Sequence, residues 1–281
     1  MPTTYTHWKF GTEIYSRLPD SIRRDVDRSP ELYAIGQHGP DIFFYYNAVT
    51  KNPVNRLGNA MHRQPAAVFL EPAAERLRWL PADRGHRAWI YGFICHFMLD
   101  SCVHWYVEDK IAASGVSHSE IEAEFDRILM VRDGLDPVSF RPVGHIVPSD
   151  ENALVIAGFF PELSVLQVQK SLQDMVRYLK LLVCPGKTKR AFLTNGIRIL
   201  GLGQSIGDMI INLEPDPCCA DSNAELTRLF NLALDETVEV LVEFEAAVRN
   251  GTPLPTRFSR TFGPDKESKE QYEEKHEADP A

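Results

Sequence analysis

The sequence has few of the features that mark a disulfide-rich, nucleic-acid-binding or secreted protein. Its five cysteines are odd in number and irregularly spaced, and Cys218-Cys219 is not a CxxC metal motif, so we expect free thiols in a reducing compartment. Basic residues are in the minority, 30 against 39 acidic residues, and the net charge of −9 argues against nucleic acid as a partner. No charged segment followed by an apolar run opens the chain, so no secretory signal is expected, and the cytoplasm is the expected location.

Only one segment raises the question of a membrane span. Residues 88–107 include neither Lys nor Arg over twenty positions, which is a sufficient length. Asp100 lies inside this segment, however, and an aspartate near the centre of a span costs about 2.5–3.5 kcal/mol. We therefore predict a buried central helix without a transmembrane span, and at most transient contact with a membrane.

The hydrophobic pattern is helical throughout. No sustained alternation of β-branched residues and no internal repeat occurs, and 44% hydrophobic with 25% charged residues is typical of a globular protein. Ser29 before Pro30, Ser117 three residues before Glu120, and Gly251 after a long amphipathic stretch are typical of helix ends. The patterns predict an all-α, multi-helix bundle with helices over residues 7–18, 30–36, 88–110, 117–130, 163–183, 189–213 and 222–250, another beginning at 149, a turn at 39–41 and a broken helix over 53–80.

The predicted domain organisation is simple. No Pro/Gly/Ser-rich linker divides the chain, so residues 1–258 are expected to form a single all-helical domain. Residues 259–281 are charged and poor in apolar side chains, with seven acidic residues and three lysines between positions 265 and 279. Such a segment cannot bury enough apolar surface to fold alone, and we expect a disordered acidic tail.

The predicted central helix carries the pattern His96-x3-Asp100-x3-His104. Helical residues four apart are separated by about 6 Å along the axis and lie on nearly one face. Imidazole and carboxylate groups are good zinc ligands, and a carboxylate among apolar residues must be paired or hold a metal. No Lys or Arg lies between Arg87 and Lys110 to neutralise Asp100, which favours a metal site. The alternative is a polar core network of the aspartate with its neighbouring imidazoles.

A second pair, His118 and Glu122, lies one helical turn apart after a short loop. Alone, this spacing is typical of any acidic amphipathic helix with a solvated first turn. An antiparallel helix pair would, however, bring this turn back beside His104, where the pair could complete a metal site.

Three further residues look out of place for packing alone: His7, Asp41 and His62. Each by itself is more typical of a helix cap, a turn residue or a satisfied surface histidine than of a ligand. We favour the same interpretation for three other histidines, His38, His86 and His145.

Taken together, these residues resemble the bacterial zinc-dependent phospholipase C family, which is related to the P1-type zinc nucleases. The resemblance covers about residues 6–127, and the strings GPDIFFYY, GNAMH and YGFICHFMLDSCVH are similar to the uncharacterised intracellular branch of that family. It implies a helical bundle of this type with eight metal ligands, which are His7, Asp41, His62, His96, Asp100, His104, His118 and Glu122.

The resemblance also implies how two or three zinc ions would be held. By position, the three ligand sets are Asp41, His62, His96 and Asp100; His104, His118 and Glu122; and His7 with a bridging Asp100. Paired metals stabilise the attacking and leaving oxygens of a phosphodiester and lower the pKa of bound water. Asp41 resembles the carboxylate that orients or deprotonates this water, and it is the predicted general base.

Two departures from the secreted members are visible. In those enzymes the mature N-terminal tryptophan contributes to the third zinc, whereas this chain begins Met1-Pro2, and the interval from Asp100 to His104 is shorter here. No C-terminal lipid-binding β-domain is expected either, because the remaining sequence is helical and then acidic.

The predicted function is a zinc-dependent phosphodiester hydrolase, most similar to phospholipase C, acting on a phospholipid or a small phosphodiester. One alternative is a nuclease or nucleotidase of the P1 type, which the negative net charge disfavours. Another is a non-catalytic helical scaffold stabilised by metal with closed coordination. Substitution of Asp41 separates these hypotheses, because a catalytic site would lose rate and keep its fold, whereas a structural site would lose stability.

Overall fold

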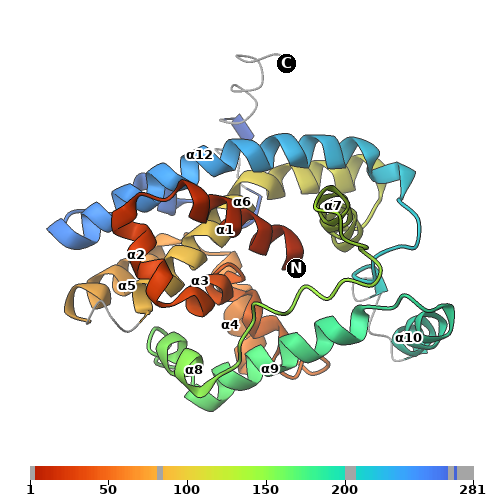
Figure 1. Ribbon diagram of the computed structural model, residues 1–281, viewed down its shortest axis with the longest axis horizontal. Helices are drawn as coiled ribbons and strands as arrows, with labels where there is room; N and C mark the ends of the chain where they lie inside the picture. Colours follow the sequence, from red (N-terminus) through yellow and green to blue (C-terminus); the bar gives the residue numbers. More distant parts are fainter. Residues whose placement is uncertain (1–3, 81–84, 200–206, 265–268, 271–281) are drawn as a thin grey trace.

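The computed structural model of the protein describes residues 4–80, 85–199, 207–264 and 269–270. Within these residues every regular element is a helix and no strand occurs, which confirms the predicted all-α fold (Figure 1). The elements are α1 (Thr4–Arg17), α2 (Asp20–Arg28), α3 (Pro30–Gly36), η1 (Gly39–Tyr45), α4 (Pro53–His62), α5 (Ala67–Trp79), α6 (His86–Ser114), α7 (His118–Arg132), α8 (Asp150–Ala157), α9 (Val165–Leu182), α10 (Lys187–Ile199), η3 (Pro217–Cys219), α12 (Ala220–Asn250) and η4 (Thr256–Ser259).

Helix α6 is the centre of the molecule. It begins after Gly85 and ends before Gly115, and both glycines have a φ of 73°, the left-handed conformation that glycine adopts most easily. Most of its side chains from His86 to Val107 are buried, and α12 lies along its length (Figure 1). Among the described residues, no helix is long and apolar enough to cross a lipid bilayer. The burial of α6 against α3 and α12 confirms the predicted buried central helix.

Two glycines allow α3 to lie unusually close to α6. A Cβ atom added at Gly36 would lie 2.3 Å from the carbonyl oxygen of Trp89, and one at Gly92 would lie 2.2 Å from that of Tyr33. The close approach places η1, which follows α3 directly, against the middle of α6. Gly39 at the start of η1 has a φ of 46° and touches the His96 ring, where a Cβ would clash.

Several predicted helix ends are confirmed by their caps. The Ser117 hydroxyl accepts a hydrogen bond from the Glu120 backbone N–H at 3.2 Å, and the Ser149 hydroxyl accepts one from Asn152 at 3.1 Å. Gly251 ends α12 with a φ of 70°.

Other expectations from the sequence need correction. The predicted turn at 39–41 is the start of the 3-10 helix η1. The predicted broken helix over 53–80 is confirmed as two helices, α4 and α5, although Pro72 lies inside α5 and does not end it. Helix α2 was not predicted from the sequence, because only Ile22 and Val26 are buried in an otherwise charged segment and two apolar residues give no clear helical period. Of the predicted helix over 189–213, only the part to Ile199 is described as helix; residues 200–206 lie outside the described residues.

The ordered chain extends past the predicted boundary at residue 258. The backbone carbonyl of Arg260 accepts a hydrogen bond from Ala66 N at 2.9 Å, and Phe262 is 1% exposed. The buried Phe262 side chain and backbone hydrogen bonds therefore hold residues 259–264, which composition assigns to the disordered tail. The rest of the predicted tail, 265–268 and 271–281, lies outside the described residues.

Candidate metal centre

The side chain of Asp100 on α6 lies at the centre of four imidazole rings. Its Oδ1 is 3.2 Å from Nε2 of His7 and 3.9 Å from Nε2 of His104. Its Oδ2 is 3.2 Å from Nε2 of His96 and 3.9 Å from Nε2 of His62. Asp100 is 3% exposed, so each oxygen of one buried carboxylate faces two imidazole nitrogens.

The eight residues predicted as ligands all come together around this carboxylate. They arrive on five elements that lie far apart in the sequence, α1, η1, α4, α6 and α7. Three groups have donor atoms close enough to share an ion, within 4.8 Å of one another: His7, His96 and Asp100; Asp41, His62 and His96; and His104, His118 and Glu122. Compared with the predicted sets, His96 joins His7 and Asp100, and Asp100 is absent from the group of Asp41, His62 and His96; the third group has the predicted members.

The turn of α7 that carries His118 and Glu122 lies beside His104, as the short loop predicts. Oε1 of Glu122 is 3.0 Å from Nε2 of His118 and 3.5 Å from Nε2 of His104. The side chains of His118 and His62 are 32% and 19% exposed, whereas those of His7, His96 and Asp100 are 6% or less. Solvent therefore reaches the centre past His118 and past His62.

Backbone carbonyls set the orientation of three rings. Nδ1 of His62 lies 2.8 Å from the carbonyl oxygen of Gly58, Nδ1 of His96 lies 3.2 Å from that of Gln37, and Nδ1 of His104 lies 2.6 Å from that of Phe262. A carbonyl oxygen only accepts, so each Nδ1 carries the hydrogen and donates it. In the neutral ring, Nε2 then presents a lone pair to the centre, which is the arrangement of metal-ligating histidines.

The donor set fits metal ions. Nε2 of His96 is buried without a hydrogen-bond partner, although it lies 3.2 Å from Oδ2 of Asp100, and Nδ1 of His7 is likewise buried without one. A nitrogen lone pair and a carboxylate oxygen repel each other at this distance unless a cation or a proton lies between them. Burial alone would raise the pKa of Asp100, but the surrounding imidazoles hold that pKa well below its ordinary value. A buried anion ringed by nitrogen donors is a suitable site for zinc.

Asp126 is a supporting residue that sequence reasoning missed. Its carboxylate accepts hydrogen bonds from the backbone N–H of Tyr5 at 3.2 Å and of Thr6 at 2.8 Å, and from the Thr6 hydroxyl at 2.6 Å. It thereby holds the start of α1, one residue before His7. The available signal was its position four residues after Glu122, which places both carboxylates on one side of α7.

Three histidines outside the predicted ligand set make other contacts. His38 is buried, and its Nε2 lies 2.7 Å from Nε2 of His145, which in turn stacks on the Trp8 ring. Burial lowers the pKa of His145 to about 4 and that of His38 well below its ordinary value, so the pair is neutral near pH 7. His86 is buried and packs edge-on against Phe159. None of the three belongs to a candidate metal group among the described residues, though His38 and His86 are buried rather than on the surface.

The comparison with protein families agrees with this geometry. The profile of the family described as zinc dependent phospholipase C matches residues 6–161, more than half of the chain. The chain belongs to the zinc-dependent phospholipase C family. All eight predicted ligands lie within the matched region, whereas Phe262, whose carbonyl orients His104, lies outside it. No curated protein and no solved structure matches the chain.

Proposed function

We propose that the protein is a phospholipase C-like phosphodiester hydrolase that uses two or three zinc ions. The observation that carries the proposal is the position of Asp100, with each carboxylate oxygen facing two imidazole nitrogens. A single bridging carboxylate is the arrangement that holds ions close enough to act on one phosphoryl group. A merely structural zinc site would need only one closed set of four ligands.

Each ligand set would hold one ion. The proposed sets are Asp41, His62, His96 and Asp100; His104, His118 and Glu122; and His7, His96 and Asp100. Zinc bound here would supply neutralisation of phosphoryl charge and a lowered pKa for bound water. His118 and His62 are more exposed than His7, His96 and Asp100, so a phosphodiester would approach the centre past one of them.

Asp41 is the proposed general base. It lies in the first turn of η1 and is 7% exposed, with Oδ1 3.0 Å from Nε2 of His62. Burial would raise its pKa, but the imidazoles of His62 and His96 keep that pKa below its ordinary value. The group is therefore a carboxylate at neutral pH, able to accept a proton from the attacking water.

The test combines metal content with turnover. Purified protein is expected to contain two to three equivalents of zinc by plasma mass spectrometry and to hydrolyse phosphodiesters in a screen that includes phospholipids. Asp41→Asn is expected to lower kcat by about 10²–10⁴-fold while the circular dichroism spectrum stays unchanged. Cleavage of single-stranded nucleic acid in preference to lipid would favour the P1-type alternative. Protein that neither retains nor takes up stoichiometric zinc would refute the proposal.

A further inference from the structure

One segment of the chain has a charge unlike the rest. From residue 175 to 207 the chain contains no Asp or Glu and six basic residues, whereas the whole chain has a net charge of −9. The basic residues of this segment are Arg177, Lys180, Lys187, Lys189, Arg190 and Arg198. They belong to the C-terminal end of α9 and to α10, which lie together at one end of the long axis (Figure 1).

Helix α10 also presents large apolar side chains to solvent. Phe192 is 81% exposed and Ile199 is 82% exposed. The two residues are seven apart, which places them on one stripe of the helix, with the exposed Lys189 beside it. On α9, Leu181 is 44% exposed next to the exposed Lys180. Basic and apolar groups therefore share this surface.

The inner face of α10 is already occupied. Ile197 packs with Cys184 and Ile210 in a small apolar cluster that is separate from the main core. Arg190 donates hydrogen bonds to the backbone carbonyls of Ile211 at 2.6 Å and of Cys184 at 3.4 Å. Because these contacts fix the helix, a rotation that buried Phe192 would break them. The exposed stripe is a feature of the folded protein.

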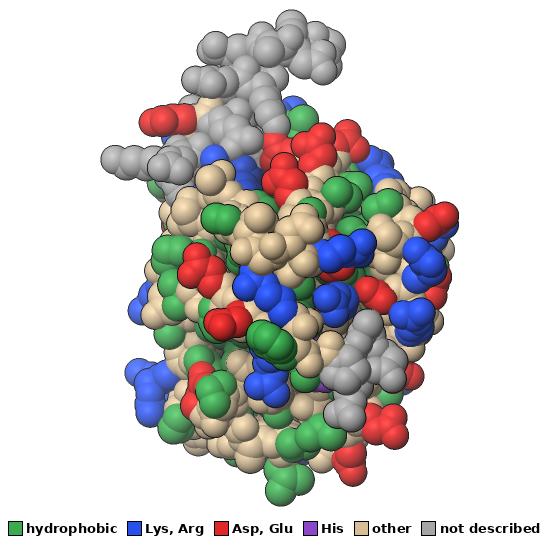
Figure 2. All heavy atoms as spheres, turned by 90° about the vertical axis from the view of Figure 1, so that its left-hand side faces the viewer, with side chains coloured by type: hydrophobic (Ala, Val, Ile, Leu, Met, Phe, Trp, Pro, Cys, Tyr) green, Lys and Arg blue, Asp and Glu red, His purple; other side chains and the backbone are tan. Residues whose placement is uncertain are grey.

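Exposed apolar residues elsewhere have different surroundings. Trp79 is 84% exposed, but it ends α5, where Glu71 and Glu75 accompany Arg76 and Arg78. Helix α5 lies at the opposite end of the molecule from α10 (Figure 1). Figure 2 shows that end, where acidic and basic side chains are interspersed around scattered apolar ones. Helix α10 and the C-terminal end of α9 combine exposed large apolar side chains with basic residues and carry no acidic residue after Asp174.

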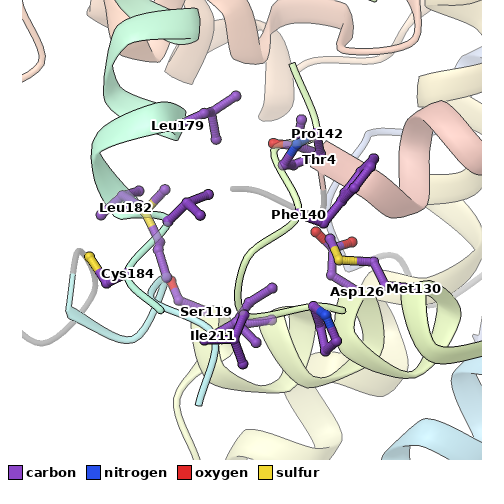
Figure 3. A pocket seen from close by; sticks show the side chains of 15 residues that line it. Thr4, Ser119, Asp126, Met130, Phe140, Pro142, Leu179, Leu182, Cys184 and Ile211 are labelled. Carbon is purple, nitrogen blue, oxygen red and sulfur yellow. The ribbon is translucent and has the colours of Figure 1, made fainter. Parts of the chain in front are cut away.

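An apolar cavity lies between the C-terminal end of α9 and helix α7. The cavity measures about 50 Å³ and is lined mainly by apolar residues. Leu182 of α9 and Ile211, whose carbonyl accepts a hydrogen bond from Arg190 of α10, line it together with Phe140 (Figure 3). Its α7 wall includes Ser119 and Ala123, which directly follow His118 and Glu122 in the chain. The C-terminal end of α9 therefore lies close to the helix that carries two of the predicted ligands.

We propose that α10 and the C-terminal end of α9 form a surface that docks on an anionic lipid bilayer. Phe192 and Ile199 would enter the boundary between headgroups and acyl chains. The exposed lysines Lys180, Lys187 and Lys189 would pair with anionic headgroups. The acidic remainder of the chain is repelled by such a bilayer, so electrostatics also orient the molecule with α10 toward the membrane. The inference rests on the proposed function only in that the bilayer would carry the substrate.

The test is sedimentation of the full-length protein with phosphatidylcholine vesicles that contain or lack phosphatidylserine. We expect binding that requires phosphatidylserine and weakens with added salt. The double variant Phe192→Ser/Ile199→Ser and the double variant Lys187→Glu/Lys189→Glu should each bind at least about tenfold more weakly. Trp79→Ser, which removes an equally exposed aromatic at the opposite end, is the matched control and should bind as wild type does.

Turnover separates this inference from the proposed function. On a water-soluble phosphodiester below its micelle concentration, the Phe192→Ser/Ile199→Ser variant should equal wild type, and on vesicles it should be at least about tenfold slower. The docking surface is refuted if wild-type protein does not bind vesicles that contain phosphatidylserine. It is also refuted if the α10 variants bind these vesicles as strongly as wild type does. Self-association through α10 without vesicle binding overturns it as well, in favour of a second copy as occupant. Vesicle binding without any phosphodiester turnover would instead support the surface and refute the proposed function.

Discussion

The carbonyl of Phe262 orients His104 from outside the family-matched region, and this contact allows a discriminating experiment. Phe262 and Phe258 lie in the same C-terminal segment and are 1% and 0% exposed. Replacement of either by alanine should lower the free energy of unfolding by about 3–5 kcal/mol, because each removes a fully buried aromatic ring. In a chain of this size, that corresponds to a fall in Tm of roughly 6–20 °C for both variants.

The two variants should differ in zinc affinity. The Phe262 ring packs against the rings of His62 and His96, at centroid distances of 5.2 and 5.8 Å, and its carbonyl accepts from His104. Phe258 packs instead between Phe97 and Phe244. Phe262→Ala keeps the carbonyl but removes the ring that holds it against His104, and displacement of a partner that orients a metal ligand typically costs about 10–100-fold in affinity. Only Phe262→Ala should therefore weaken zinc binding by this factor.

The assay is competition for zinc against a chromophoric chelator, at a temperature where circular dichroism shows both variants folded. Equal zinc affinities for Phe258→Ala and Phe262→Ala would refute the reasoning, because the effect would then be one of general stability. Unchanged zinc affinity together with an unchanged Tm in Phe262→Ala would show that the segment does not pack on the centre at all.

Three further predictions concern the centre and its supports. His96→Ala should reduce bound zinc by more than His118→Ala, because His96 belongs to two ligand groups and His118 to one; equal losses by plasma mass spectrometry would contradict the shared role. Burial raises the pKa of Asp126 to about 7, so its contribution to stability is complete below about pH 4 and is lost as the pH rises through 7, by up to about 4 kcal/mol. Denaturant titrations between pH 4 and 8 should show this loss in wild type and not in Asp126→Asn; identical profiles would exclude it. Gly92→Ala should destabilise the protein by more than about 1 kcal/mol and weaken zinc binding, because the new Cβ would lie 2.2 Å from the Tyr33 carbonyl oxygen; thermal unfolding that matches wild type would refute the close contact.

Local patterns made part of the centre predictable. His96, Asp100 and His104 lie on one face of α6 because helix geometry alone places residues four apart in line. The short loop before Ser117 similarly predicted that His118 and Glu122 return beside His104. His7, Asp41 and His62 have no such local link to α6, and only the family resemblance predicted that they join the centre. The assignment of individual ions to these ligands stays a prediction.

The remaining parts depend on contacts that residue types do not encode. The acceptor for His104 is a backbone carbonyl 158 residues away, and every residue type has a carbonyl. Composition alone assigned the segment that contains it to a disordered tail, since one phenylalanine among charged residues gives no periodic signal. The packing of α3 on α6 likewise depends on two glycines that meet only after folding.

The use of main-chain oxygens to hold three ligand rings has a consequence for how the protein can vary. Gln37, Gly58 and Phe262 each contribute a carbonyl, so exchange of a side chain there reaches the histidine only by moving the backbone. Substitutions at Gln37 that preserve the local chain path should therefore be tolerated among relatives, whereas at Phe262 the buried ring also holds the carbonyl in place. A single-residue insertion or deletion nearby would shift the oxygen by a full residue and should be selected against. Loop lengths, more than residue identities, are the quantity to compare when new members of this family are aligned.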